Sequence, residues 1–308
     1  MSKTQHLPAA ILAPNGGPIL VTGQHGQLAT ALRALGGPRI QCIGRPELDF
    51  DAPDTLQKTF DAIKPSAIIN AAAWTAVDLA ESEEAAATRA NATGPAELAR
   101  LCAAADIPFL HVSTDYVFAG DKGAPYVETD PISPQTVYGR SKAMGEALTL
   151  AANPKTLIFR TAWVYSAHGK NFVRTMLNAG AKNPALKVVG DQKGNPTSAD
   201  DLARALLEVL AYIENNGWQD AFAGIYHACG TGETTWHGLA VATLQEATHH
   251  GQAMPDITAI ATQDWPTPAK RPADSRMDTS KLARTFGVTL PHWGDSVKRT
   301  VRDIFNQR

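Results

Sequence analysis

The segment PILVTGQHGQLATAL, residues 18–32, predicts the fold of this chain. A short apolar run ends at Gly23, and the residues from Gly26 onward have the composition of a helix start. The spacing Gly23-x-x-Gly26-x-x-Ala29 matches the glycine-rich turn between the first strand and the first helix of dinucleotide-binding folds. Missing side chains in such a turn let backbone N–H groups and the helix N-terminus approach a pyrophosphate. Because alanine replaces the third glycine, the pattern alone leaves cofactor binding and an ordinary turn both open.

The alternation of strand and helix continues along the chain. Apolar runs at 39–43, 66–70, 109–114 and 156–165 are separated by helical stretches, one of which is expected over about 83–105. This alternation predicts an α/β fold with a doubly wound parallel sheet, Rossmann-like in arrangement. His111 falls inside the run at 109–114 and is expected to be a core or interface histidine.

After residue 165 the regular pattern fades, which predicts a smaller, interleaved C-terminal substrate lobe. The N-terminal residues contain no sustained apolar stretch and end in a Pro-Asn-Gly-Gly sequence, so a disordered extension is expected there. The expected organisation is an extension over 1–17, a dinucleotide-binding domain over 18–165 with a return of the chain near 186–215, and a mainly substrate-binding lobe over 166–308.

Composition excludes several classes of function. The 308 residues are 44% hydrophobic and 19% charged, with a formal net charge of −2, so there is no basic field that indicates nucleic acid or an anionic membrane surface. The sequence contains no uninterrupted apolar run long enough to span a membrane. Cys42, Cys102 and Cys229 are far apart and lack the spacing of zinc sites. A cytoplasmic protein without a disulfide framework is expected.

The chemistry is predicted by Tyr138 and Lys142, which are four residues apart and therefore share one face of a helix. A neighbouring ammonium favours the phenolate and lowers the pKa of a tyrosine from its usual value of about 10. Such a phenol can hand a proton to a developing alkoxide. Thr114 ends the strand at 109–114 and is expected at the same edge of the sheet. The alternative is a half-buried tyrosine beside a solvated lysine.

The residues that follow the second strand indicate whether NAD or NADP is the preferred cofactor. An acidic residue there holds the ribose 2′-hydroxyl of NAD, whereas an arginine accommodates the 2′-phosphate of NADP. Gly44 and Arg45 stand at this position. Arg45 therefore favours NADPH, with NADH still open if this arginine is only a solvated loop residue.

Taken together, these motifs resemble the extended short-chain dehydrogenase/reductase superfamily and, within it, the dTDP-4-dehydrorhamnose reductase family. The resemblance extends over nearly all of residues 18–300. It is carried by seven stretches, which are TGQHGQL at 22–28, NAAAWTAVD at 70–78, STDYVF at 113–118, YGRSK at 138–142, FRTAWVY at 159–165, DQKGNPT at 191–197 and RPADSR at 271–276.

The resemblance implies a reductase that acts on the 4-keto group of a dTDP-linked 6-deoxyhexose, dTDP-4-dehydro-6-deoxy-L-mannose, and produces dTDP-L-rhamnose for surface polysaccharide. It implies that Tyr138 is the general acid, that Lys142 holds the nicotinamide ribose, and that Thr114 orients the carbonyl. Asp115 and Trp163 would face the sugar, unless Trp163 is an ordinary core residue. The expected cofactor-binding residues are Gly23, Gly26, Gln27, Leu28, Arg45, Asp49, Phe50, Ala73, Trp74, Thr75, Val112, Tyr138 and Lys142.

Two features depart from the family pattern. Trp74 stands where relatives often carry histidine, so its side chain has no assigned role. The helix expected over 28–35 has no carboxylate, whereas some relatives use acidic residues there for a magnesium ion between subunits. No metal is therefore expected, and a homodimer stays open.

Two alternative functions remain. The first is a regulatory subunit that resembles that of methionine adenosyltransferase, against which the retained Thr114, Tyr138 and Lys142 weigh. The second is another sugar-nucleotide epimerase, dehydratase or reductase. A dehydratase normally carries carboxylates after the threonine, and here only Asp115 follows it.

Overall fold

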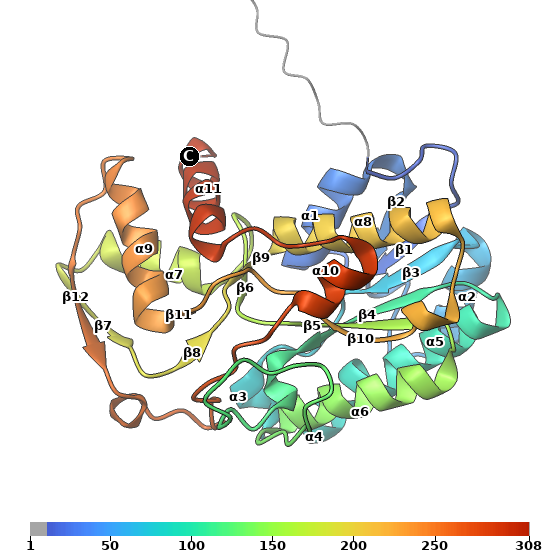
Figure 1. Cartoon of the computed structure of the whole chain (residues 1–308), viewed down its shortest axis with the longest axis horizontal. Coiled ribbons are helices and arrows are strands. Elements are labelled where there is room, and N and C mark those ends of the chain that lie inside the picture. The colour runs from blue at the N-terminus through green and yellow to red at the C-terminus, as the bar shows by residue number, and fades with distance from the viewer. Residues whose placement is uncertain (1–10, 308) are drawn as a thin grey trace, which may run out of the picture.

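The computed structural model describes residues 11–307 of the chain. Its centre is a parallel six-stranded sheet in the order β10-β5-β4-β3-β1-β2 (Figure 1). The strands are β1 (Ile19–Thr22), β2 (Ile40–Ile43), β3 (Ala67–Asn70), β4 (Phe109–Thr114), β5 (Thr156–Thr161) and β10 (Gly224–His227). The doubly wound parallel sheet expected from the sequence is thereby confirmed.

The strand order determines where along the sheet a ligand-binding cleft can form. From β1 the chain adds β2 on one side and then β3 on the other, so the order of addition reverses between β1 and β3. Ligands of open α/β sheets bind beyond the carboxyl ends of the strands at such a reversal. The glycine-rich turn and the Ala71–Thr75 loop therefore meet at one edge.

Helices cover both faces of the sheet. Alternation along β1 sends Ile19 and Val21 to one face and Leu20 to the other. The first face is covered by α1 (Gln27–Gly36), α8 (Ala199–Asn216) and α10 (Ser280–Phe286), and the second by α2 (Asp54–Ile63), α5 (Gly94–Ala104) and α6 (Val137–Ala152).

The single long helix expected over 83–105 contains a π-helical turn. α4 (Glu84–Thr88) passes into this turn (Arg89–Thr93) and then into α5, with α3 (Val77–Ala80) just before them. Pro95 has no N–H, so it cannot bond to the carbonyl of Asn91, and Gly94 N–H bonds to Arg89 O instead. A Cβ at Gly145 on α6 would lie 2.0 Å from Asn91 O. The glycine thus lets α6 approach the Asn91 carbonyl closely.

A second lobe lies beside the sheet (Figure 1). Its core is formed by residues that include Val173, Leu177, Leu239 and Val301. Its helices are α7 (Phe172–Gly180), α9 (Trp236–Thr248) and α11 (Trp293–Asn306), and its strand pairs are β6 (Val164–Tyr165) with β9 (Thr197–Ser198), β7 (Ala185–Val189) with β12 (Asp256–Ile260), and β8 (Lys193–Gly194) with β11 (Thr234–Thr235). Short 3-10 turns complete the described part at Gly37–Arg39, Asp115–Val117, Asp220–Phe222 and Thr262–Asp264.

The return of the chain to the first domain begins later than expected. β7 pairs with β12 of the second lobe, whereas α8 packs on α1 and β10 pairs with β5 of the central sheet. The first return is therefore at residues 199–227 and not 186–215, and α10 returns to the same face later in the chain. The apolar residues of β7 favour a strand, but they do not say which partner strand completes the sheet.

The N-terminal segment also differs from expectation over residues 11–17, whereas residues 1–10 lie outside the described part. Leu12 is 2% exposed and belongs to the core beside α1. Arg39 donates hydrogen bonds to Ala13 O at 3.0 Å and to Gly17 O at 2.8 Å. These contacts fix the segment at 11–17, and sequence composition gave no sign of them.

Within residues 11–307, no helix has the length and apolar character needed to cross a bilayer. Cys42, Cys102 and Cys229 are free and buried.

Candidate functional site

A cleft of about 680 Å³ opens along the carboxyl ends of β1 to β4. It is lined by the turn after β1, the loop after β2, the loop after β3 and one face of α6. All the residues predicted from the sequence to bind the cofactor lie on its walls, namely Gly23, Gly26, Gln27, Leu28, Arg45, Asp49, Phe50, Ala73, Trp74, Thr75, Val112, Tyr138 and Lys142. The structure brings this set together at one site.

The glycine-rich turn is shaped for a close ligand. Gly23 has φ +86°, and a Cβ there would lie 3.2 Å from the backbone of Ala72. Gly26 N donates to Gly23 O at 2.9 Å, and Gly26 caps α1 without a side-chain hydrogen bond. The first N–H groups of α1 therefore remain available at the floor of the cleft, as a pyrophosphate requires. This geometry fits a dinucleotide.

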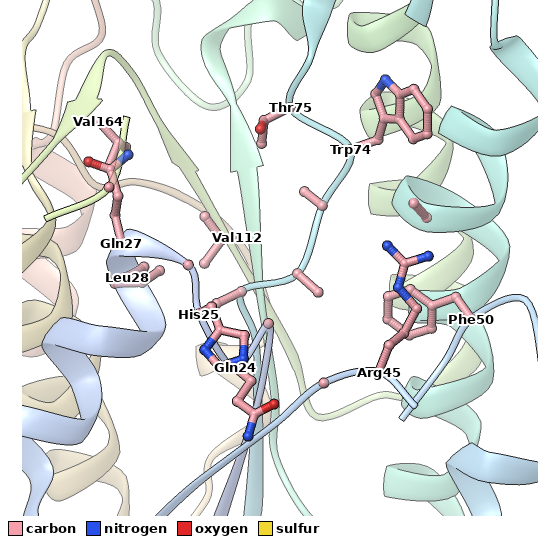
Figure 2. A pocket seen from close by; sticks show the side chains of 18 of the residues that line it. Gln24, His25, Gln27, Leu28, Arg45, Phe50, Trp74, Thr75, Val112 and Val164 are labelled. Carbon is pink, nitrogen blue, oxygen red and sulfur yellow. The ribbon is translucent and has the colours of Figure 1, made fainter. Parts of the chain in front are cut away.

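One side of the cleft carries Arg45 and Phe50, opposite Gln27 and Leu28 (Figure 2). Phe50 is packed against Gly94, where a Cβ would lie 2.3 Å from the ring. A flat apolar surface and a guanidinium at this side suit an adenine and a neighbouring phosphate.

The loop after β3 is held by a residue that the sequence did not single out. Asn91 accepts from Trp74 N at 2.8 Å and donates to Trp74 O at 3.1 Å and to Ser141 Oγ at 2.9 Å. The Trp74 indole donates to Ala76 O at 3.2 Å. Asn91 lies in the π-helical turn, and because a uniform helix was expected over 83–105, no pattern pointed to it.

Tyr138 and Lys142 share one face of α6, which begins at a Thr136 cap whose hydroxyl accepts from Gly139 N at 3.0 Å. Lys142 is 1% exposed, and its Nζ lies 2.6 Å from Val112 O and 3.3 Å from His111 Nε2. Burial lowers the pKa of Lys142 to about 8, opposed by Glu146. The lysine is therefore turned toward β4.

The expected lowering of the Tyr138 pKa is not found in the protein without cofactor. Burial raises the pKa of Tyr138 to about 12, Thr114 opposes this through a hydrogen bond, and Asp115 adds to it. The phenol is therefore protonated at neutral pH. The pattern of a tyrosine and a lysine four residues apart gave the shared face, but not the direction in which the lysine points.

Thr114 and Asp115 lie next to the phenol at the end of β4. Thr114 Oγ1 donates to Asp115 Oδ1 at 3.0 Å and accepts from Tyr116 N at 3.2 Å. Asp115 is 2% exposed, and burial raises its pKa to about 6 against the opposing hydroxyls of Ser275 and Thr114. Ser275 belongs to the RPADSR stretch, so this carboxyl joins the sheet to the second lobe.

Trp163 stands between the two lobes with φ +48°. Its ring stacks on Trp236 with centroids 3.6 Å apart and planes 9° apart. A Cβ at Gly194 would lie 2.6 Å from the Trp163 ring, so the glycine of DQKGNPT makes room for the indole. Thr114, Asp115 and Trp163 lie outside the wall of the cofactor cleft, and the first two lie beside its Tyr138 end.

Several lining residues were not predicted. They include Gln24, His25, Ser113, Lys170 and Leu202. Gln24 and His25 occupy the variable positions of the glycine turn, while Lys170 comes from the irregular segment after β6. No spacing rule points to such loop residues.

Comparison with known proteins gives a consistent result. The model of the RmlD substrate binding domain family matches residues 17–305. A dTDP-4-dehydrorhamnose reductase of Sinorhizobium fredii strain NGR234 is 42% identical over 288 residues, which are 92% of this chain and 96% of the relative.

Two solved structures are similar over 93% of this chain and 99% of theirs. A dTDP-4-dehydrorhamnose reductase of Clostridium acetobutylicum is 37% identical with a TM-score of 0.85. A dTDP-4-dehydrorhamnose reductase of Bacillus anthracis, in complex with NADP, is 29% identical with a TM-score of 0.85.

Proposed function

The chain belongs to the dTDP-4-dehydrorhamnose reductase family, and we propose that it reduces the 4-keto group of dTDP-4-dehydro-6-deoxy-L-mannose to give dTDP-L-rhamnose. The observation that carries this proposal is the position of Tyr138, Lys142 and the glycine-rich turn on the walls of one cleft. The enzyme is an NAD(P)H-dependent oxidoreductase of dTDP-rhamnose biosynthesis.

The N-terminus of α1, the glycine turn and the Arg45 side would hold the dinucleotide. A reduced nicotinamide supplies a hydride when it is bound. Lys142 would hold the ribose hydroxyls and thereby orient the ring. Arg45 would bind the 2′-phosphate, which favours NADPH over NADH.

Tyr138 acts as the general acid. Because its pKa is raised to about 12, the phenol keeps its proton until charge develops on the carbonyl oxygen and the proton is transferred. Thr114 donates a hydrogen bond to the same oxygen and stabilises the developing charge. Lys142, as an ammonium, then stabilises the phenolate that remains.

Asp115 and Trp163 would contact the sugar. Asp115 offers a carboxyl close to Tyr138, and the indole of Trp163 offers a flat apolar wall for the methyl group of a deoxysugar. Both residues lie on the side of the second lobe, which supports a sugar nucleotide that bridges the two lobes.

The experiment that tests the function uses purified protein with NADPH or NADH and with dTDP-4-dehydro-6-deoxy-L-mannose generated in place. Substrate-dependent loss of reduced nicotinamide absorbance is expected, faster with NADPH. Folded protein that oxidises neither cofactor would contradict the proposal and favour a different keto sugar or a regulatory subunit. Oxidised cofactor retained through purification would instead favour an epimerase or dehydratase.

A cytoplasmic homodimer is the proposed state of the enzyme. The three free, buried cysteines support a reducing compartment. Light scattering at several protein concentrations would test the dimer, and a constant monomer mass would contradict it.

A further inference from the structure

His111 is buried in β4 and contacts a residue of the proposed catalytic group. Its Nε2 lies 3.3 Å from Lys142 Nζ, and its Nδ1 lies 2.8 Å from Asn70 Nδ2. The ring is fully buried and stacks near Phe109, with centroids 6.1 Å apart. The mechanism proposed above gives this histidine no role, although it is the side chain that faces Lys142 from the sheet.

Hydrogen-bond donors and acceptors along this chain of side chains fix its direction. The backbone N–H of Ala72 donates to Thr22 Oγ1 at 3.0 Å, and the Thr22 hydroxyl donates to Asn70 Oδ1 at 2.5 Å. In this orientation the amide of Asn70 presents its NH₂ group to His111 Nδ1, which then accepts. A neutral imidazole that accepts at Nδ1 carries its proton on Nε2.

The Nε2–H group then points at Lys142. A neutral amine can accept this hydrogen bond and at the same time donate to Val112 O, which lies 2.6 Å from Nζ. An ammonium has only donors, so it would face Nε2–H donor to donor. The geometry at His111 thus favours the neutral form of the lysine.

The charges around Lys142 agree with this direction. Glu146 on the same helix favours the ammonium, but its carboxylate is engaged in a buried ion pair with Arg160. Burial outweighs it and lowers the pKa of Lys142 to about 8. The pKa of His111 is also well below its usual value because of burial and of Lys142 itself, so the imidazole stays neutral.

We propose that His111 is a positioning residue that, as the Nε2–H tautomer, lowers the proton affinity of Lys142 and keeps its Nζ against Val112 O while the cleft is free of cofactor. Ribose hydroxyls then offer oxygen acceptors, so Lys142 turns away from His111 and binds its proton more tightly. The cofactor thereby strengthens the ammonium that stabilises the Tyr138 phenolate. This inference rests on the proposed role of Lys142 as the ribose-binding residue.

The test is nuclear magnetic resonance on the full chain labelled with ¹⁵N-histidine and with ¹³C-lysine at Cε, without substrate. The ring nitrogens of His111 are expected to show the Nε2–H tautomer, and Lys142, assigned with Lys142→Met, is expected to titrate well below the other lysines. Addition of NADP⁺ is expected to raise the Lys142 midpoint. An Nδ1–H tautomer, an imidazolium at neutral pH or an ordinary lysine midpoint would overturn the inference.

Asn70→Asp changes the direction of the chain of hydrogen bonds. A carboxylate at 70 can only accept, so His111 should move its proton to Nδ1 and offer Nε2 as an acceptor to the Lys142 ammonium. The tautomer is expected to switch and the Lys142 midpoint to rise. An unchanged Nε2–H tautomer in folded Asn70→Asp protein would contradict the proposed direction.

His111→Phe keeps the size of the ring and removes its N–H. The proton affinity of Lys142 is then expected to rise about tenfold, the equivalent of one hydrogen bond. The matched control is His227→Phe, which replaces a second fully buried histidine whose Nδ1 lies 3.0 Å from Asp278 O; there the Lys142 midpoint should not move. Equal shifts in the two variants would overturn the inference.

These measurements need no turnover, so they separate this inference from the proposed function. If the wild-type protein reduces the sugar with NADPH but His111 is found as the Nδ1–H tautomer, the proposed function stands and only the inference about His111 fails. If His111 and Lys142 behave as expected but the sugar is not reduced, the proposed function fails and the inference about these two side chains stands. If the variants do not fold, the wild-type tautomer and titration still decide.

Discussion

Arg160 and Glu146 form a buried, two-pronged ion pair that attaches the catalytic helix to the sheet. Arg160 Nε lies 2.9 Å from Glu146 Oε1, and Nη2 lies 2.7 Å from Oε2. The side chains are 2% and 4% exposed, and Ser113 Oγ donates to the same carboxylate at 2.5 Å. Glu146 lies two turns after Tyr138 on α6, so this pair fixes how the phenol stands over β4.

Glu146→Gln is expected to lower the free energy of unfolding by about 3–5 kcal/mol, because it leaves a buried guanidinium without its counter-charge. Urea denaturation measures the change. Glu97→Gln serves as the control, since the exposed Glu97–Arg100 pair should contribute about 1 kcal/mol or less. Equal losses of unfolding free energy in the two variants would show that the buried pair stabilises the fold no more than the exposed pair does.

Tyr138→Phe is expected to fold, to bind NADPH and to lose about 10²–10⁴ in kcat, since it removes the proposed general acid. Tyr116→Phe is the matched control, because the Tyr116 ring lies 5.4 Å from that of Tyr138 and has no proposed proton to transfer. Steady-state kinetics and cofactor fluorescence give the two readouts. Near-normal turnover of Tyr138→Phe would exclude the mechanism.

Arg45→Ala tests the choice between the two nicotinamide cofactors. Loss of a guanidinium beside the 2′-phosphate is expected to raise KM for NADPH about tenfold or more, equivalent to one charge-assisted hydrogen bond, with NADH little affected. Arg100→Ala, at an exposed site on α5, is the control. If Arg45→Ala raises KM for NADPH and for NADH by the same factor, Arg45 does not discriminate between the two cofactors.

Asp115→Asn tests the buried carboxyl next to Thr114. Because folding raises the pKa of Asp115 to about 6, the native state binds the proton more tightly, so this group stabilises the fold at low pH and that contribution is lost as pH rises from about 4 to about 6. The variant is expected to be about 1–3 kcal/mol more stable than wild type at pH 7.5, with the gain vanishing near pH 4.

Denaturation of the Asp115→Asn protein at several pH values measures this difference, and Asp61→Asn, at an exposed position on α2, is the control. Turnover should fall because the sugar loses a carboxylate acceptor. A stability difference that is the same at pH 4 and pH 7.5 would contradict the assigned titration.

Gly194→Ala tests whether Trp163 contacts the sugar. The added methyl group would lie 2.6 Å from the Trp163 ring, which must shift against Trp236. KM for the sugar nucleotide is expected to rise about tenfold, while NADPH affinity stays constant. The control is Gly190→Ala, whose Cβ would meet Ala259 and His237; its KM for the sugar nucleotide and its NADPH affinity should stay near wild type. If Gly194→Ala also leaves both quantities unchanged, Trp163 does not contact the sugar.

Sequence reasoning succeeded where function requires a particular residue at a fixed spacing. Gly23 and Gly26 predicted the first turn because only glycine lets a ligand approach so closely, and Tyr138 and Lys142 predicted a shared helix face from the geometry of one turn. The apolar runs of β1 to β5 predicted the parallel sheet because buried strands need nearly continuous apolar sequence.

The rest depended on long-range contacts that spacing does not encode. Nothing in the run at 185–189 distinguishes pairing with β12 from pairing with the central sheet. Asn91 reaches the loop after β3 because it lies in the π-helical turn just before Pro95, and a uniform helix pattern does not predict that turn. The orientation of Lys142 toward His111 depends on how β4 and α6 pack. The raised pKa of Tyr138 is likewise a consequence of burial, which a motif does not measure.

The late return of α8 and β10 to the sheet has a consequence for synthesis on the ribosome. A chain that has emerged only as far as residue 165 has β5 as an open sheet edge and α1 without the cover of α8, and such edges pair with other chains. The central sheet can be completed only after about sixty more residues, counted from 165 to 227, have followed, and α10 follows later still. Cutting the gene between the two apparent lobes would therefore yield an aggregation-prone fragment, not an independent domain.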